Sequence, residues 1–89
     1  MPERRVKIAS SVGLHARPAA LFTQAAAKSS STVTIAKAGG DPVDAKSILM
    51  VLTLGAGHDD EVVLTAEGSD AEATLAELGD LLEQDLDAH

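Results

Sequence analysis

The stretch Gly13-Leu14-His15-Ala16-Arg17-Pro18-Ala19-Ala20 marks the start of the first helix and decides how the rest of the chain is organised. Proline has no N–H and fits only the first turn of a helix, and the alanine-rich run behind Pro18 favours helix formation. His15 is therefore predicted to lie at or just before a helix N-terminus, where free N–H groups and the helix dipole stabilise phosphate. Arg17 adds a planar charged group that pairs with phosphate oxygens. The pattern predicts an imidazole beside an anion-binding helix end.

The chemistry expected at this position follows from the imidazole and the helix end. Neutral imidazole is a good nucleophile toward phosphorus near neutral pH, and the positive end of a helix disfavours the charged imidazolium. The backbone N–H groups of Ala16 and Arg17 would face a phosphoryl group on His15, whereas Pro18 has no N–H to donate. Gly13 permits the tight backbone path that this placement needs. A histidine before a helix is also commonly a surface or capping residue, so these residues alone leave that alternative open.

Length and composition limit what the chain can be. With 89 residues, we expect one domain that spans residues 1–89. Phe22 is the only aromatic residue, so the core must be built from valine, isoleucine and leucine. The absence of cysteine excludes disulfides, thiol catalysis and cysteine-bound zinc, and no stretch approaches membrane-spanning length. We therefore expect a soluble, cytoplasmic protein that does not insert into a membrane. We also expect it to be a monomer that uses no cofactor of its own.

Charge is distributed unevenly along the chain. All seven lysines and arginines lie between Arg4 and Lys46, whereas the segment from Asp59 to the C-terminus is acidic and has no basic residue. The formal net charge of −7 argues against nucleic acid as a partner. The basic half contains the predicted phosphate site, so a locally positive surface there would suit an acidic partner. The acidic segment is interpreted as a solvated helix face.

Periodicity and turn residues predict the order of the secondary structure. The last helix is expected to open at a capping box, Ser69-Asp70-Ala71-Glu72. Gly79 inside that helix costs about 1 kcal/mol relative to alanine. Each strand has one apolar face, which predicts an α+β fold with a single antiparallel sheet covered by helices on one side. The expected elements are a strand at 5–8, a helix at 16–29, a strand at 32–36, an edge strand near 42–43, a short helix from 47 to Gly55, a strand at 61–66 and a final helix after the capping box.

The short helix has more apolar residues than one buried face can accept. Ser47 is well placed as its N-cap. Val51 and Leu54, together with part of Ile48, are expected to face the sheet. The other apolar side chains are predicted to form an exposed patch that binds a protein partner. They are Leu49, Met50 and Leu52.

The first helix is expected to present two different faces. Its apolar positions at helical spacing should pack on the core: Leu14, Pro18, Phe22, Ala25 and Ala26. The opposite face should join the short helix in a surface for partner binding, whose predicted members are Ala16, Ala20, Leu21, Gln24, Ile48, Leu49 and Leu52.

Two motifs resemble those of HPr, the family of histidine-containing phosphocarriers of the bacterial phosphoenolpyruvate-dependent sugar phosphotransferase system. The first is Gly13-Leu14-His15-Ala16-Arg17-Pro18-Ala19, and the second is Lys46-Ser47-Ile48-Leu49-Met50-Val51-Leu52-Thr53-Leu54-Gly55. Their separation matches that of the family to within about one residue. The resemblance implies an open-faced β-sandwich in the order βαββαβα, with four antiparallel strands and three helices.

The resemblance also implies a function and its partners. A phosphocarrier of this family is a substrate of phosphotransferases rather than an enzyme. It would be phosphorylated by enzyme I on Nδ1 of His15, with Arg17 assisting transfer, and would pass the phosphoryl group to sugar-specific IIA domains. Ser47 matches the family's regulatory serine, which a dedicated kinase phosphorylates in some bacterial lineages. Val12 departs from the family pattern, which often has a polar residue at that position.

Two other functions remain open at the level of sequence. One is a paralogue of the same fold that serves a regulatory or nitrogen-related phosphotransfer chain. The other is a small α+β module that binds an anion without forming a covalent bond. His58 and His89 lack the spacing of metal ligands, so we expect both to be surface residues and no metal site to be present.

Overall fold

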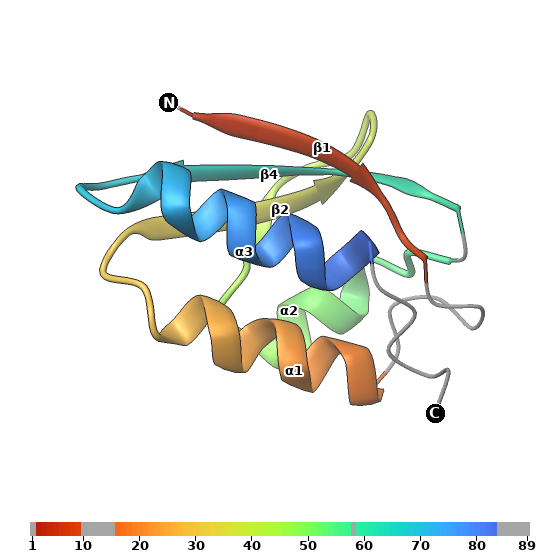
Figure 1. The fold of residues 1–89 in the computed structure, drawn as a ribbon. Helices are drawn as coiled ribbons and strands as arrows, with labels where there is room; N and C mark the ends of the chain where they lie inside the picture. The colour runs from red at the N-terminus through yellow and green to blue at the C-terminus, as the bar shows by residue number, and fades with distance from the viewer. Residues whose placement is uncertain (1, 10–15, 58, 84–89) are drawn as a thin grey trace.

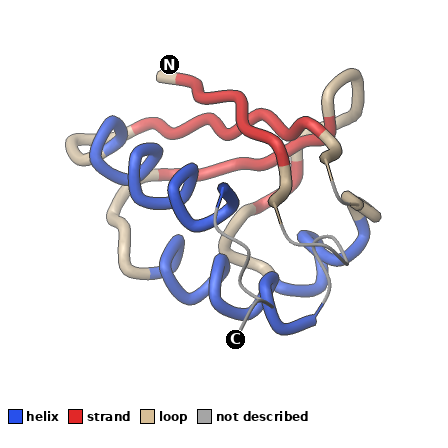
Figure 2. The backbone as a smooth tube through the Cα atoms, turned by 45° about the vertical axis from the view of Figure 1, so that its right-hand side comes forward, coloured by secondary structure: helices blue, strands red, loops and turns tan. Residues whose placement is uncertain are grey.

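The computed structural model describes residues 2–9, 16–57 and 59–83. In these residues four strands form one antiparallel sheet and three helices lie against one of its faces (Figures 1 and 2). The predicted order βαββαβα is therefore confirmed, as is the open-faced sandwich. The elements are β1 (Glu3–Lys7), α1 (Ala16–Ala27), β2 (Thr32–Lys37), β3 (Val43–Asp44), α2 (Ile48–Thr53), β4 (Glu61–Glu67) and α3 (Ala71–Glu83).

The sheet has the strand order β1-β4-β2-β3, so β4 is paired on both sides and the two-residue β3 is an edge strand, as predicted. Along β4, buried side chains alternate with partly exposed ones. This alternation turns one face toward the helices and leaves the other uncovered. Antiparallel pairing places Val6 of β1 opposite Val62 and Ile35 of β2 opposite Leu64, which lines up the inward side chains of three strands.

The core lies between the sheet and the helices and is aliphatic around a single aromatic ring. Phe22 on α1 is fully buried, and Ala26 one turn later is buried too. Ala25 is partly buried against the core, whereas Leu14 and the side chain of Pro18 lie outside the described residues. Fully buried aliphatic side chains come from the strands and from α2 and α3: Val33, Ile35, Val51, Val62, Leu64 and Leu78.

The last helix begins at Ala71, so Asp70 rather than the predicted Ser69 immediately precedes it. The Asp70 carboxylate accepts hydrogen bonds from Ser29 Oγ at 3.1 Å, from the backbone N of Ser30 at 3.3 Å and from Ser31 Oγ. Led by the Ser31 hydroxyl, these donors stabilise the ionised form and lower the pKa of Asp70. The carboxylate therefore joins the start of α3 to the segment that follows α1.

The first helix ends at Ala27, two residues before its predicted end. Lys28 N and Ser29 N bond to the carbonyls three residues earlier, which tightens the last turn. The Ser29 hydroxyl bonds to Asp70 and to Thr74 of α3. Ser29, just beyond the end of α1, thus links that helix to α3.

The glycine at position 79 of α3 leaves space for the side chain of Arg4, from the other end of the chain. Nη1 of Arg4 on β1 lies across α3 and donates to the carbonyl oxygens of Ala76 at 2.9 Å and Leu75 at 3.4 Å. A Cβ at Gly79 would overlap the Arg4 guanidinium. The glycine thus makes room for a clasp between β1 and α3. Nη2 of Arg4 also pairs with Asp80 and Glu83.

This clasp predicts that Gly79→Ala stabilises the Arg4→Ala variant but not the unmodified chain. In Arg4→Ala, where nothing occupies the space, alanine should raise the free energy of unfolding by about 1 kcal/mol through helix propensity. In the unmodified chain, displacement of the guanidinium should cancel that gain or turn it into a loss, because its hydrogen bonds are broken. Urea unfolding of the two single variants and the double variant measures the difference. Equal stabilisation by Gly79→Ala in both backgrounds would rule out the clasp.

Candidate functional site

The predicted nucleophile, His15, lies outside the described residues, together with Val12 and Gly13. Ala16 is the first residue of α1, so His15 is the residue directly before the helix in the chain. Pro18 falls in the first turn, as its missing N–H requires. The helix start expected from the motif is thus present in the structure. His58 and His89 also lie outside the described residues.

Arg17 is an exposed cation in the first turn of α1. This is the helix end at which the dipole disfavours positive charge and favours anions. The first turn contains no acidic residue that would offset it, and the last turn of the same helix has no basic residue. Arg17, the one charged residue of α1, therefore lies at the end where a positive charge destabilises a helix. Arg17 has the location expected of a residue that binds an anion.

Ser47 caps α2 as predicted. Its backbone is extended, and its Oγ accepts a hydrogen bond from Met50 N at 3.4 Å. The helix ends with Leu54 N bonded to Val51 O, and Gly55 follows with φ of 62°, in the left-handed region that glycine adopts without strain. The boundaries expected from sequence, Ser47 and Gly55, are the two residues that start and stop this short helix.

Apolar side chains from α1 and α2 form an exposed patch. Val51 is fully buried and Leu54 is partly buried, so these two face the core as predicted. Ile48, which was expected to turn partly toward the sheet, is exposed because Val51 and Leu54 already occupy the buried side of this short helix. We call the following five residues, with their exposed fractions, the apolar patch: Leu21 (41%), Ile48 (37%), Leu49 (73%), Met50 (42%) and Leu52 (36%).

The other predicted members of this surface have different environments. Gln24 is exposed and Ala20 is partly buried, while the side chain of Ala16 lies outside the described part of the chain. Met50, which was predicted with Leu49 and Leu52 to form an exposed patch, is as exposed as Leu21. The signal that identifies it is the excess of apolar residues around α2, since one buried face accepts only two of them.

One contact that was not predicted from the sequence joins the two helices of this surface. Nζ of Lys46, the residue before Ser47, donates to the carbonyl oxygen of Ser29, just beyond the C-terminal end of α1, at 2.9 Å. This contact could have been expected because the last turn of α1 has no basic residue, and a helix C-terminus attracts a cation from elsewhere in the chain.

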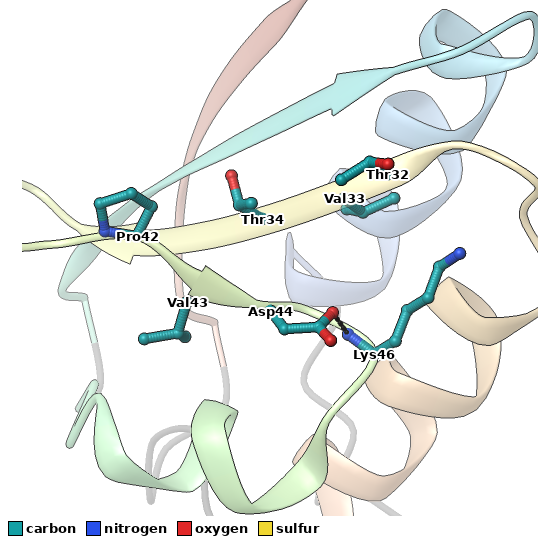
Figure 3. Close-up of a pocket in the computed structure, with 7 residues that line it drawn as sticks. All are labelled: Thr32, Val33, Thr34, Pro42, Val43, Asp44 and Lys46. Atoms are coloured by element: carbon teal, nitrogen blue, oxygen red, sulfur yellow. Dashed lines mark hydrogen bonds between the residues drawn. The ribbon is translucent and has the colours of Figure 1, made fainter.

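Two hollows in the described structure lie away from Arg17 and the apolar patch. One, of about 440 Å³, lies beside β2 and β3 and includes Asp44 and Lys46 in its lining (Figure 3). The other, of about 490 Å³, lies on the uncovered face of the sheet and is rimmed by Arg5 and Lys37. Neither is lined by a residue of α1 or α2.

A metal centre and a membrane span are both missing from the part of the chain that the structure describes. Carboxylate side chains there do not gather in groups of three or more that could hold a metal ion, and all three histidines lie outside the described residues. The described helices are also too short or too polar to cross a bilayer.

Comparison with known proteins connects this geometry to a family. A family model described as "PTS HPr component phosphorylation site" matches residues 2–84. The "Phosphocarrier protein HPr" of Streptomyces coelicolor is 48% identical over 87 residues, which cover 98% of this chain and 94% of that protein. The "Multiphosphoryl transfer protein" of Vibrio cholerae is 44% identical over 75 residues, which cover 82% of this chain and 19% of that protein. The crystal structure of HPr-C-His from Thermoanaerobacter tengcongensis has a TM-score of 0.91 and 42% identity, and covers 100% of this chain and 99% of that one.

The exposure of the apolar patch predicts that its leucines contribute little to folding. Leu49→Ser should lower the free energy of unfolding by less than 1 kcal/mol, and Leu52→Ser by slightly more because it is less exposed. Leu64→Ala, at a fully buried position, should cost about 2–5 kcal/mol and serves as the control. Urea unfolding of the three variants checks this order. A loss at Leu49 as large as that at Leu64 would show that this leucine belongs to the core.

Proposed function

Since the chain belongs to the HPr family of phosphocarriers, which carry a phosphoryl group rather than act as enzymes, we propose that His15 accepts a phosphoryl group from phosphorylated enzyme I. The carrier then passes it to sugar-specific IIA domains in phosphoenolpyruvate-dependent sugar uptake. Three features support the proposal: the helix that starts directly after His15, the exposed Arg17, and the apolar patch nearby on α1 and α2.

The observation that carries the proposal is the placement of Arg17. An exposed cation in the first turn of α1 opposes the helix dipole, so helix stability does not account for it. An anion at the same helix end would be favoured by the dipole, by the free N–H groups and by the guanidinium together. Because Arg17 follows His15 by two residues, a phosphoryl group on that imidazole is the anion that fits this arrangement.

The proposed transfer needs only the imidazole and its surroundings. A lone pair of neutral His15 attacks phosphorus, forming a P–N bond while the bond from phosphorus to the donor breaks and its electrons return to the donor. The other ring nitrogen keeps its proton. The N–H groups at the start of α1 and the Arg17 guanidinium would stabilise charge on the phosphoryl oxygens. Delivery to the acceptor is the same step in reverse, with the acceptor as nucleophile.

The apolar patch is proposed as the surface that meets both donor and acceptor. Five large apolar side chains exposed on two adjoining helices are more than folding requires. Neither α1 nor α2 contains an acidic residue, and Arg17 and Lys28 are exposed cations at the two ends of α1. This surface therefore suits a partner that presents apolar groups within an acidic rim. We keep the contact residues proposed from sequence: Ala16, Ala20, Leu21, Gln24, Ile48, Leu49 and Leu52, together with Met50 of the predicted exposed patch.

Ser47 is proposed as a regulatory phosphorylation site that a serine kinase and phosphatase would act on. It caps α2 and directly precedes the exposed residues of that helix. A phosphate there would add about −1.5 to −2 charges at a helix N-terminus, which the fold tolerates. The same charge beside the apolar patch would repel an acidic partner and slow phosphorylation of His15.

Replacement of His15 tests the function directly. Incubation with phosphoenolpyruvate, magnesium and enzyme I should add one acid-labile phosphoryl group, detected by intact-protein mass measurement, and His15→Ala should abolish that gain. His58→Ala and His89→Ala serve as controls and should be phosphorylated normally. Phosphorylation of His15→Ala would refute the assignment, and an unmodified protein that binds phosphate without covalent change would identify an anion-binding module instead.

Replacement of Arg17 separates transfer from folding. Arg17→Ala should slow phosphoryl transfer at least about tenfold, the equivalent of one charge-assisted hydrogen bond of roughly 1.5 kcal/mol. Its free energy of unfolding should stay unchanged or rise by a few tenths of a kcal/mol, because a cation is removed from the positive helix end. Rapid-quench kinetics and urea unfolding provide the two readouts, with Lys28→Ala as the control for loss of charge. Normal transfer combined with lost stability would make Arg17 a structural residue.

A further inference from the structure

The position of α2 depends on few contacts. The helix has six residues, and only Val51 among them is buried. Isolated helices of this length are unstable in water, so α2 must be held in place by its surroundings. Hydrogen bonds connect α2 to the rest of the fold at its N-terminal end, in the turn that leads from β3 to Ser47.

That turn is fixed by hydrogen bonds on both sides of Lys46. Asp44 Oδ1 accepts from Lys46 N at 2.9 Å, and the Asp44 carbonyl accepts from Ser47 N at 3.2 Å. Ala45, between them, is buried and donates its N–H to Val33 O of β2 at 3.0 Å. The backbone of Lys46 is therefore anchored to the sheet, and its side chain extends away from Asp44 beside the ribbon of α1 (Figure 3).

The ammonium group of Lys46 supplies the positive charge that the C-terminal end of α1 lacks. The partly buried hydrogen bond from Lys46 Nζ to Ser29 O, 2.9 Å long, places an ammonium group at the negative end of α1. No basic residue occupies the last turn of α1 itself. Seventeen positions separate Lys46 from Ser29, so the contact ties the start of α2 to the end of α1.

We propose that Lys46 is a positioning residue for partner recognition. The apolar patch is divided between Leu21 on α1 and four residues on α2, so the orientation of the two helices sets its shape. By linking the helices at one end, Lys46 holds the two parts of the patch in one arrangement before a partner binds. This inference rests on the proposed function, and it assigns Lys46 to recognition of enzyme I rather than to phosphoryl transfer.

Steady-state kinetics of phosphorylation by enzyme I test the inference with three variants. Lys46→Met keeps the aliphatic stem and removes the ammonium, whereas Lys28→Met removes an exposed positive charge beside Ser29. Lys46→Met should raise KM for the carrier about three- to tenfold with kcat unchanged, and Lys28→Met should raise it less. Lys46→Arg, which keeps the charge and its donors, should restore KM.

Hydrogen exchange supplies a readout that does not depend on a partner. Without the tether, the amides of Ser47 and Met50 should exchange faster in Lys46→Met, while that of Leu64 in the central strand stays protected. Equal KM values for Lys46→Met and Lys28→Met, with normal phosphorylation of both, would overturn the positioning role alone. Failure of the unmodified chain to be phosphorylated would overturn the proposed function, and this role with it.

Discussion

The inward face of β4 is the surface on which the rest of the molecule is assembled. Val62, Leu64 and Ala66 are fully buried on it, and the strand is hydrogen-bonded to β1 on one side and β2 on the other. With one aromatic side chain in 89 residues, the chain depends on aliphatic side chains such as these to bury apolar area. The inward residues of β1 and β2 align with those of β4, and helices α1 and α3 close over them (Figure 1). As a result, helices cover one face of the sheet and the other face stays uncovered (Figure 1).

The same constraint explains why a partner surface exists at all. Two long helices are enough to cover one face of four strands, so α2 contributes only Val51 fully to the core. Its remaining large side chains stay exposed and adjoin Leu21 of α1. A carrier that meets several partners needs a surface that binds without large rearrangement. Exposed aliphatic side chains on the short helix α2, which Ser47 caps, provide such a surface. The apolar patch thus exists because α1 and α3 already cover the sheet, which leaves the side chains of α2 free to bind a partner.

Sequence patterns located the elements and their order because each is encoded locally. Alternation marked β4, a proline marked the first turn of α1, and Ser47 and Gly55 marked the ends of α2. The exposure of Leu49 and Leu52 was also predictable, since it follows from counting apolar residues on a short helix.

What could not be predicted depends on residues far apart in the chain. Ser69 looked like the helix cap, but Asp70 stands directly before α3 and bonds to Ser29, about forty residues away. From the sequence, Gly79 was expected only to weaken the last helix, but in the structure the Arg4 guanidinium occupies the space beside it. The position of His15 rests on the motif and on the start of α1 at Ala16, because the histidine itself lies outside the described residues.

The clasp between Arg4 and α3 has a consequence for how the molecule folds during synthesis. Strand β1 leaves the ribosome well before the strand that pairs with it and the helix that holds its arginine, because both lie more than fifty residues later in the chain. The inward side of β1 therefore stays uncovered until β4 and α3 have been synthesised, and contacts this distant in sequence close slowly. The polar and charged residues at both ends of this strand keep an unpaired edge from binding other chains during that interval.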